Sequence, residues 1–121
     1  MKGGFCLQLE INDIKLLKIL NEPNKLIKKV GLEMAKKIQQ RFNELKASSN
    51  FKQYLDIGIG NPHPLTGNLD NLFGINLNKN YRLIVKPIVN SLDDKSLREC
   101  KNIEIKGVMD YHDGKYKWLI P

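Results

Sequence analysis

Ile103-Glu-Ile-Lys-Gly-Val-Met-Asp-Tyr-His112 is the stretch of sequence that decides the fold of this chain. Its apolar and β-branched residues alternate with polar ones, which is typical of a strand with one buried face. A similar segment, Tyr81-Arg-Leu-Ile-Val-Lys86, comes before it. Because successive side chains of a strand point to opposite faces, the pattern predicts one buried row and one exposed row in each strand.

The predicted exposed rows carry most of the chemistry. In the earlier strand Tyr81, Leu83 and Val85 are expected in the core, and the row on the other face is Arg82, Ile84 and Lys86. In the final strand the row opposite Ile103, Ile105 and Met109 consists of Glu104, Lys106, Val108, Asp110 and His112. We therefore expect a cationic, titratable surface that can grip and cut a phosphodiester.

The rest of the sequence predicts an α+β chain. Alternation over 5–11 indicates a first strand, and Asn12 or Asp13 can cap a short helix that ends near Leu20. After Pro23 a longer helix is predicted from about Asn24 to Ala47, with Gly31 as a kink. Its apolar stripe is Leu26, Ile27, Val30, Met34, Ile38, Phe42 and Leu45.

Downstream of this helix the sequence turns to loops and strands. Ser48 and Ser49 end the helix or cap a short turn, and residues 58–64 form a Gly/Pro-rich loop. Phe73, Ile75 and Leu77 alternate, and the turn at 78–80 predicts an antiparallel hairpin with the strand at Tyr81. Residues 89–102 are polar and charged, which indicates a surface loop.

Length and charge limit the class of protein. The 121 residues predict one domain, 1–121, and 20 Lys and Arg against 13 Asp and Glu give a net charge of +7. That balance favours an anionic partner, with nucleic acid first. Cys6 and Cys100 lack metal-ligand spacing and are expected to be reduced thiols. No apolar run approaches the roughly 20 residues that cross a bilayer, so we expect a cytoplasmic protein without membrane contact.

A second basic feature is the predicted outer face of the long helix. It carries Lys25, Lys28, Lys29, Lys36, Lys37, Arg41 and Lys46. Either a nucleic-acid patch or an ordinary solvated helix face accounts for it equally well.

Four motifs in order carry a family resemblance. They are Met34-Ala-Lys-Lys-Ile-Gln-Gln-Arg-Phe-Asn-Glu-Leu45, His63-Pro-Leu-Thr-Gly67, Tyr81-Arg-Leu-Ile-Val85 and Asp110-Tyr-His112. Together they resemble the HigB-type branch of the RelE/ParE toxin superfamily, the plasmid-maintenance killer proteins. The resemblance runs from about Leu7 to His112.

The resemblance implies a fold and an activity. The fold is two N-terminal helices packed on a small antiparallel sheet. The activity is that of a type II toxin: metal-independent, cofactor-free cleavage of mRNA, usually on the ribosome, by attack of the RNA 2′-hydroxyl to leave a 2′,3′-cyclic phosphate. A cognate antitoxin, commonly with a helix-turn-helix part, neutralises such toxins.

Candidate catalytic residues follow from what this chemistry needs. Arg82 has a planar cationic side chain that can stabilise the negative charge on the phosphoryl oxygens. The alternative is a surface ion pair with Glu104 or Asp110. His112 is the residue type best suited to move a proton at physiological pH, with Tyr111 and Asp110 beside it.

The remaining candidates have a supporting role. His63 is a second possible acid or base, or only a shaper of the loop. Lys86 and Lys106 can neutralise RNA phosphates. Tyr111, Tyr116 or Trp118 can stack a base, although Tyr111 fits the core almost as well.

Two departures from the family keep alternatives open. Thr66 stands where members often have a lysine, so the chain can also be a catalytically silent module that binds an antitoxin or RNA. The gyrase-inhibiting ParE branch shares the fold, but tends to lack a histidine at the position of His112. The tail 113–121 runs past the end of many members and can add a strand, cover part of the cleft or dock on the antitoxin.

Overall fold

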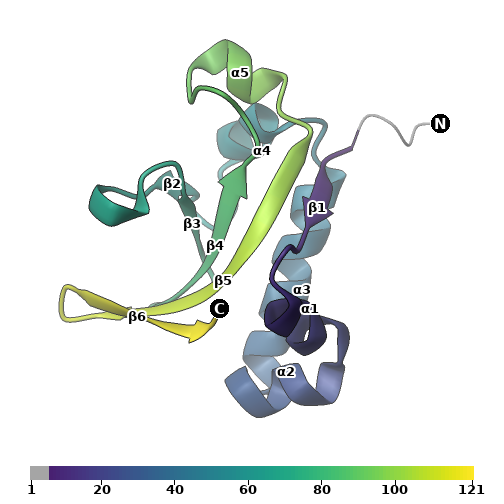
Figure 1. Cartoon of the computed structure of the whole chain (residues 1–121), viewed down its shortest axis with the longest axis vertical. Coiled ribbons are helices and arrows are strands. Elements are labelled where there is room, and N and C mark those ends of the chain that lie inside the picture. Colours follow the sequence, from purple (N-terminus) through teal and green to yellow (C-terminus); the bar gives the residue numbers. More distant parts are fainter. Residues whose placement is uncertain (1–5) are drawn as a thin grey trace.

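A computed structural model describes residues 6–121 of the chain and shows a mixed sheet with helices against it (Figure 1). The predicted first strand is β1 (Gln8–Glu10), and Phe5 lies outside the described residues. The sheet has the order β1-β5-β4-β3-β2, with β6 paired to β5. The other strands are β2 (His63–Pro64), β3 (Phe73–Asn76), β4 (Tyr81–Pro87), β5 (Asn102–His112) and β6 (Lys115–Ile120).

The family resemblance implied an antiparallel sheet, but the observed sheet is mixed. β1 pairs with β5 in the parallel sense, Gln8 opposite Asn102 and Glu10 opposite Glu104. The predicted hairpin of β3 and β4 is confirmed, and the Asn78 side chain accepts hydrogen bonds from the backbone N–H groups of Asn80 and Tyr81 in its turn. The tail forms β6, antiparallel to β5, which is one of the three arrangements considered for it.

Within residues 6–121, four helices rather than two precede β2. They are α1 (Ile14–Asn21), α2 (Pro23–Val30), α3 (Leu32–Ala47) and α4 (Phe51–Ile57). Asp13 caps α1 by accepting the Leu16 N–H at 2.9 Å. The predicted single helix from Asn24 to Ala47 is wrong, because Gly31 (φ 88°, ψ 160°) breaks it completely into α2 and α3. Only glycine enters this region of backbone space readily.

Residues 89–102 are not simply a surface loop. Asp93 caps the short helix α5 (Asp94–Arg98) by accepting the Ser96 N–H at 2.8 Å. Leu97 and Cys100 are buried against the core. Two apolar side chains among polar neighbours were too weak a pattern to predict this helix.

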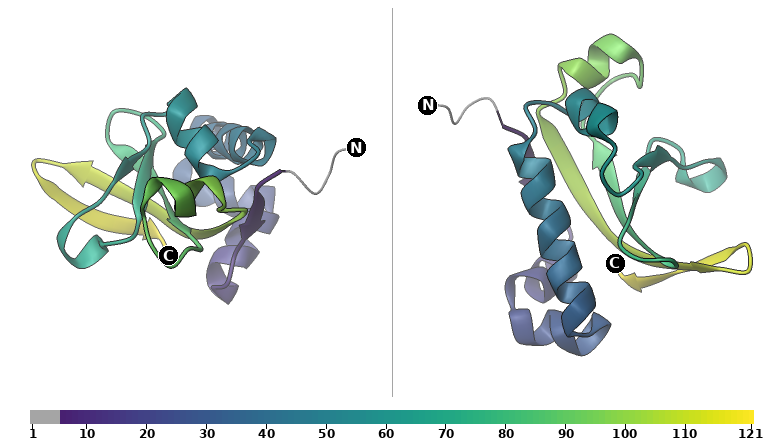
Figure 2. Two further views of the ribbon diagram at one scale, coloured as in Figure 1. Left: turned by 90° about the horizontal axis from the view of Figure 1, so that it is seen from above. Right: turned by 180° about the vertical axis from the view of Figure 1, so that it is seen from behind.

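The core lies between α1–α4 and one face of the sheet. Figure 2 shows α3 running beside β5, with the β5–β6 ribbon extending away from the helices. The predicted stripe is largely confirmed, and its buried members are Leu26, Met34, Ile38, Phe42 and Leu45. They join Leu83, Val85, Ile103 and Ile105 from the sheet. No helix in the range 6–121 is both long and apolar enough to cross a membrane.

Arg41 is not on a solvated helix face. It is buried, its Nε donates to the Asn76 carbonyl at 2.9 Å, and its Nη1 donates to Glu44 at 2.8 Å. Of the other basic residues predicted on this face, Lys37 is half-buried and Lys25, Lys28, Lys29, Lys36 and Lys46 are exposed. Arg41 therefore ties α3 to the end of β3 and is removed from the candidate nucleic-acid patch.

A bulge in β5 reverses the predicted rows of side chains. Ile84 pairs with Gly107 but Val85 pairs with Ile105, so Lys106 has no partner in β4. Beyond the bulge Met109 lies opposite Arg82, and Asp110 lies opposite Tyr81. Directly opposed residues share a face of the sheet. The face that carries Arg82, Ile84 and Lys86, here called the open face, therefore receives Met109 and Tyr111 rather than Val108, Asp110 and His112.

Gly107 is the residue that permits this bulge. Its φ is 141°, and a Cβ there would overlap the carbonyl oxygen of Ile120 and lie 3.1 Å from the Trp118 ring. We predict that Gly107→Ala lowers the free energy of unfolding by about 3 kcal/mol, because it adds backbone strain and a clash with β6. Chemical denaturation checks the value.

Gly114 is the matched control for this substitution. It also has a positive φ, 74°, but a Cβ there would meet no atom of residues 6–121 within 4 Å. Gly114→Ala should cost only about 1 kcal/mol, the strain of a left-handed residue alone. Equal losses in the two variants would mean that β6 does not pack on Gly107 as described.

Candidate active site on the open face of the sheet

A hollow of about 310 Å³ opens on the open face between the β2 segment and the β5–β6 ribbon. These parts lie on the same side of β3 and β4 in Figure 1, the side away from α1–α3. We call it the Tyr111 hollow, and its lining residues are His63, Pro64, Leu65, Thr66, Leu69, Tyr111 and Tyr116. The structure thus brings three predicted site residues, His63, Tyr111 and Tyr116, to one place.

Two tyrosines line the ribbon side of the Tyr111 hollow, and Arg82 lies beside one of them without lining the hollow itself. Tyr111 and Tyr116 are cross-strand partners whose ring centroids are 5.7 Å apart and tilted by 32°. The Arg82 guanidinium carbon lies 5.7 Å from the centroid of the Tyr111 ring, which is within cation–π range. Tyr111 is therefore at the surface site and not in the core, where it was almost equally expected.

Burial raises the pKa of Tyr111 above the ordinary value for a tyrosine, and the neighbouring Tyr116 adds to that rise. The positive charge of Arg82 acts in the opposite direction. The net effect keeps the phenol protonated at neutral pH, so the hydroxyl is available as a hydrogen-bond donor.

Arg82 is held at one nitrogen by the hairpin turn. Its Nη1 donates to the carbonyls of Asn78, Lys79 and Tyr81 at 3.1–3.2 Å. The surface ion pair considered from the sequence does not form, since within residues 6–121 Glu104 pairs with Lys106 and Asp110 with His112. Anchored at the turn, the guanidinium is a cation fixed in place beside the aromatic wall, as charge stabilisation requires.

His63 faces the Tyr111 hollow from the opposite side. Its Nδ1 lies 2.8 Å from the Asn61 carbonyl oxygen, which can only accept, so Nδ1 carries the proton. In the neutral ring Nε2 then holds a free lone pair. The ring packs over Gly74, its partner in β3, where an added Cβ would lie 3.4 Å from Nε2, an ordinary van der Waals contact. The arrangement suits a general base.

Asp110 and His112 lie away from this group. The bulge places them on the face opposite to Arg82, with Lys117 and Lys115 as their partners in β6. His112 Nδ1 is 3.0 Å from Asp110 Oδ1, and the imidazole is exposed at the end of the ribbon. The structure thus pairs these two candidates with each other and separates them from Arg82 and Tyr111.

The two lysines proposed for phosphate contacts also have defined places. Lys86 is exposed on the open face, opposite Glu104 in β5. Lys106 is the bulge residue, and its Nζ lies 3.3 Å from Glu104 Oε2. Both lie on the open face, on the far side of the bulge from the Tyr111 hollow.

Thr66 lines the Tyr111 hollow, so the departure from the family pattern falls within the site itself. Leu65 and Leu69, which line it as well, were not predicted as site residues. Ile84, predicted on an exposed row, is buried under this face, and Met109 is buried on this face rather than on the one predicted for it. The sequence did contain one signal for this change of face, Gly107, because a glycine inside a strand pattern often marks a bulge.

The comparisons with known proteins agree with this fold. The YoeB–YefM complex from Staphylococcus aureus matches with a TM-score of 0.53 and 21% identity, over 88% of this chain and 97% of that chain. The YoeB/ParE toxin from Agrobacterium tumefaciens matches with a TM-score of 0.54 and 13% identity, over 88% and 99%. The structure of the YoeB dimer from Staphylococcus aureus gives 0.52 and 21%, over 88% and 97%.

These likenesses show the fold. The chain has the mixed α+β fold seen in these YoeB and YoeB/ParE toxin structures. At these identities the likeness carries the architecture and not the HigB branch. No protein-family model matches the sequence, and no curated protein matches it significantly.

The contact between Arg82 and Tyr111 predicts opposite shifts in two variants. Arg82→Ala should raise the pKa of Tyr111 further, because it removes the cation that favours the phenolate. Tyr116→Phe should lower it, because it removes the neighbouring ionisable phenol. NMR titration of isotopically labelled tyrosines, with Tyr111→Phe to assign the signal, measures both. A lower pKa in Arg82→Ala would contradict the described contact.

Proposed function

We propose that this chain is the toxin of a type II toxin–antitoxin system and an endoribonuclease of the HigB type that cuts mRNA on the ribosome. The observation that carries the proposal is the Tyr111 hollow, where a neutral phenol and an imidazole with a free lone pair face one space, with the Arg82 cation beside the phenol. The fold likeness to YoeB/ParE-type toxins supports the same class.

The proposed reaction is an internal transfer at phosphorus. His63 Nε2 takes the proton from the RNA 2′-hydroxyl, whose oxygen attacks the adjacent phosphorus. The bond from phosphorus to the 5′-oxygen breaks, leaving a 2′,3′-cyclic phosphate and a 5′-hydroxyl. The protonated phenol of Tyr111 donates its hydrogen to the departing oxygen. Each proton transfer of this kind contributes about 10²–10⁴-fold to the rate.

Arg82 carries the electrostatic part of this reaction. Negative charge develops on the phosphoryl oxygens, and a preorganised cation stabilises it without reorganisation. The place of the family lysine is taken by Thr66, whose hydroxyl has no charge to offer. Arg82, beside Tyr111, is therefore the cation that supplies this stabilisation in the proposal.

The other predicted residues bind rather than react in this proposal. Lys86 and Lys106 contact backbone phosphates, which would make RNA binding salt-dependent. Tyr116 stacks a base beside Tyr111. The exposed imidazole of His112, held by Asp110 and next to Lys115, suits a contact with RNA outside the reacting group.

The partners of the proposed toxin are an antitoxin, mRNA and the ribosome. YoeB from Staphylococcus aureus has been solved in complex with YefM as a toxin–antitoxin pair, which supports an antitoxin partner for this chain. A helix-turn-helix type of antitoxin and a cytoplasmic site of action belong to the same proposal.

Replacing Arg82 tests the proposal. Induced in a bacterial host, the wild type should arrest growth and create new 5′ ends in a reporter mRNA, read by primer extension. Arg82→Ala should cut at least about 100-fold more slowly, because a single preorganised charge-stabilising group is commonly worth that much. Antitoxin binding should persist.

Arg98→Ala is the matched control, since Arg98 is an exposed arginine paired with Asp94 on α5, and it should cut like the wild type. Growth arrest with intact mRNA would contradict the ribonuclease proposal and point to gyrase or another target. Absence of arrest would instead favour a silent binding module.

A further inference from the structure

The second notable hollow of the molecule lies beyond the bulge, at the edge of β5. β1 pairs with β5 up to Glu104 and β6 pairs with it from Val108, so 105–107 have no strand partner on that edge within the described part of the chain. A space of about 330 Å³ fills this gap. We call it the Trp118 notch, and Asp13, Glu104, Ile105, Lys106, Trp118 and Pro121 line it.

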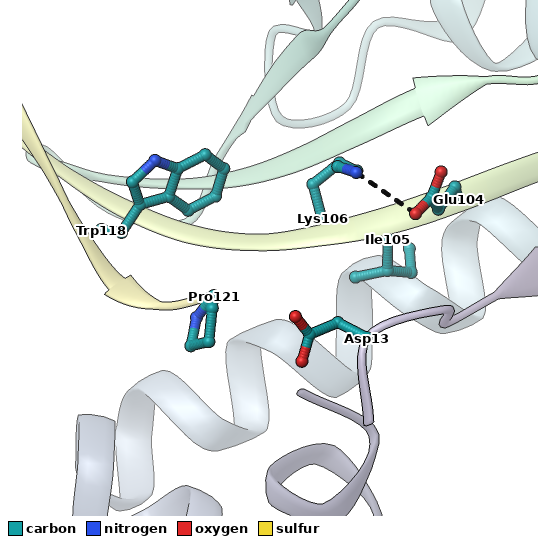
Figure 3. Close-up of a pocket in the computed structure, with 6 residues that line it drawn as sticks. All are labelled: Asp13, Glu104, Ile105, Lys106, Trp118 and Pro121. Atoms are coloured by element: carbon teal, nitrogen blue, oxygen red, sulfur yellow. Dashed lines mark hydrogen bonds and ion pairs between the residues drawn. The ribbon is translucent and has the colours of Figure 1, made fainter. Parts of the chain in front are cut away.

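The side chains of the notch divide between the two faces of β5. Figure 3 shows the Trp118 indole, the Lys106 amine and the Glu104 carboxylate on one side of the strand, and Asp13, Ile105 and Pro121 on the other. The first three belong to the open face, because Trp118 lies opposite Met109, which lies opposite Arg82. The notch is thus continuous with the face that holds the Tyr111 hollow.

We propose that the Trp118 notch is a second nucleotide subsite, which stacks the base of a nucleotide flanking the one that is cut. This inference rests on the proposed function and extends its substrate contacts. Trp118 is 41% exposed and Tyr116 is 43% exposed, which is unusual for two large aromatic side chains on one strand face. Their flat faces are the surface on which single-stranded RNA bases stack.

The spacing of these aromatic residues fits successive bases of an extended strand. Trp118 and Tyr116 are two residues apart, which separates them by about 6.6 Å along β6. That is about twice the 3.4 Å rise between stacked bases of a duplex strand. An RNA strand crossing the open face would therefore have its bases splayed apart, one on the tyrosine pair and the next on Trp118.

The polar groups of the notch suit a nucleotide as well. Lys106 can reach a backbone phosphate or a base carbonyl, and Glu104 can accept from an amino group of the base. The Glu104 side chain is only 13% exposed and its partner in the notch is Lys106. The notch therefore offers a hydrogen-bond donor, Lys106, beside an acceptor, Glu104. A bound base would replace part of the ion pair between them with hydrogen bonds to the base.

Trp118 is the single tryptophan of the chain, so its fluorescence reports on this subsite alone. The probe is a short single-stranded RNA with 2′-O-methyl groups, which lacks the attacking hydroxyl and is not cut. Titrated into the full-length wild type, it should quench the fluorescence with the same midpoint that fluorescence anisotropy of a dye-labelled copy gives for binding.

Variants separate stacking from structure. Trp118→Leu should bind the probe about tenfold more weakly, within the range known for loss of one stacked base. Trp118→Phe should stay within about threefold of the wild type, because its ring still stacks. Ile57→Ala removes an apolar side chain that is even more exposed, 57%, from α4 and should leave binding unchanged.

The outcomes distinguish the subsite from the proposed function. Binding without quenching, or equal affinity of Trp118→Leu and the wild type, would overturn the subsite while mRNA cleavage still supported the ribonuclease. Absence of RNA binding by the free protein would also overturn it. Loss of both RNA binding and mRNA cleavage in the wild type would end both proposals.

Discussion

The close approach of β6 to Gly107 is the constraint on which the site depends. A side chain at Gly107 would overlap the Ile120 carbonyl, so only glycine lets the returning strand pack there. The bulge at Lys106 and Gly107 then rotates the rest of β5 by one residue. This rotation puts Tyr111 beside Arg82 and sends Asp110 and His112 to the other face. Without the bulge, the same sequence would place Asp110 and His112, rather than Tyr111, on the face that carries Arg82.

The sequence was a good guide wherever a pattern is local. Alternation predicted the β3–β4 hairpin and the final strand, and the apolar stripe predicted which face of α3 is buried, because these patterns follow directly from strand and helix geometry. Arg82 and Tyr111 were both named as site candidates and lie beside each other, although the predicted rows did not pair them. The predicted faces of the β5 side chains after Gly107 were wrong, because the prediction assumed that the alternation continues unbroken through this glycine.

Other features depended on distant partners and were missed for that reason. The helix pattern predicts Arg41 at the surface, because the hydrogen-bond partner that buries it, the Asn76 carbonyl, is 35 positions away in the sequence. Leu97 and Cys100 are buried only because α5 folds back on α4 and the core. Gly31 was interpreted as a kink, and its backbone conformation instead ends one helix and begins the next. The Trp118 notch likewise exists only because β1 and β6 share one edge of β5.

The central claim is that the bulge in β5 places the catalytic groups on the open face. His63, which is on that face, should therefore contribute more to the rate of cleavage than His112, the histidine favoured from the sequence. The most direct measurement is the rate of cleavage of ribosome-bound mRNA by purified His63→Ala and His112→Ala. The account predicts a loss of at least about 100-fold for His63→Ala, the scale of a lost general base, and a loss of only a few-fold for His112→Ala. The reverse order would contradict it.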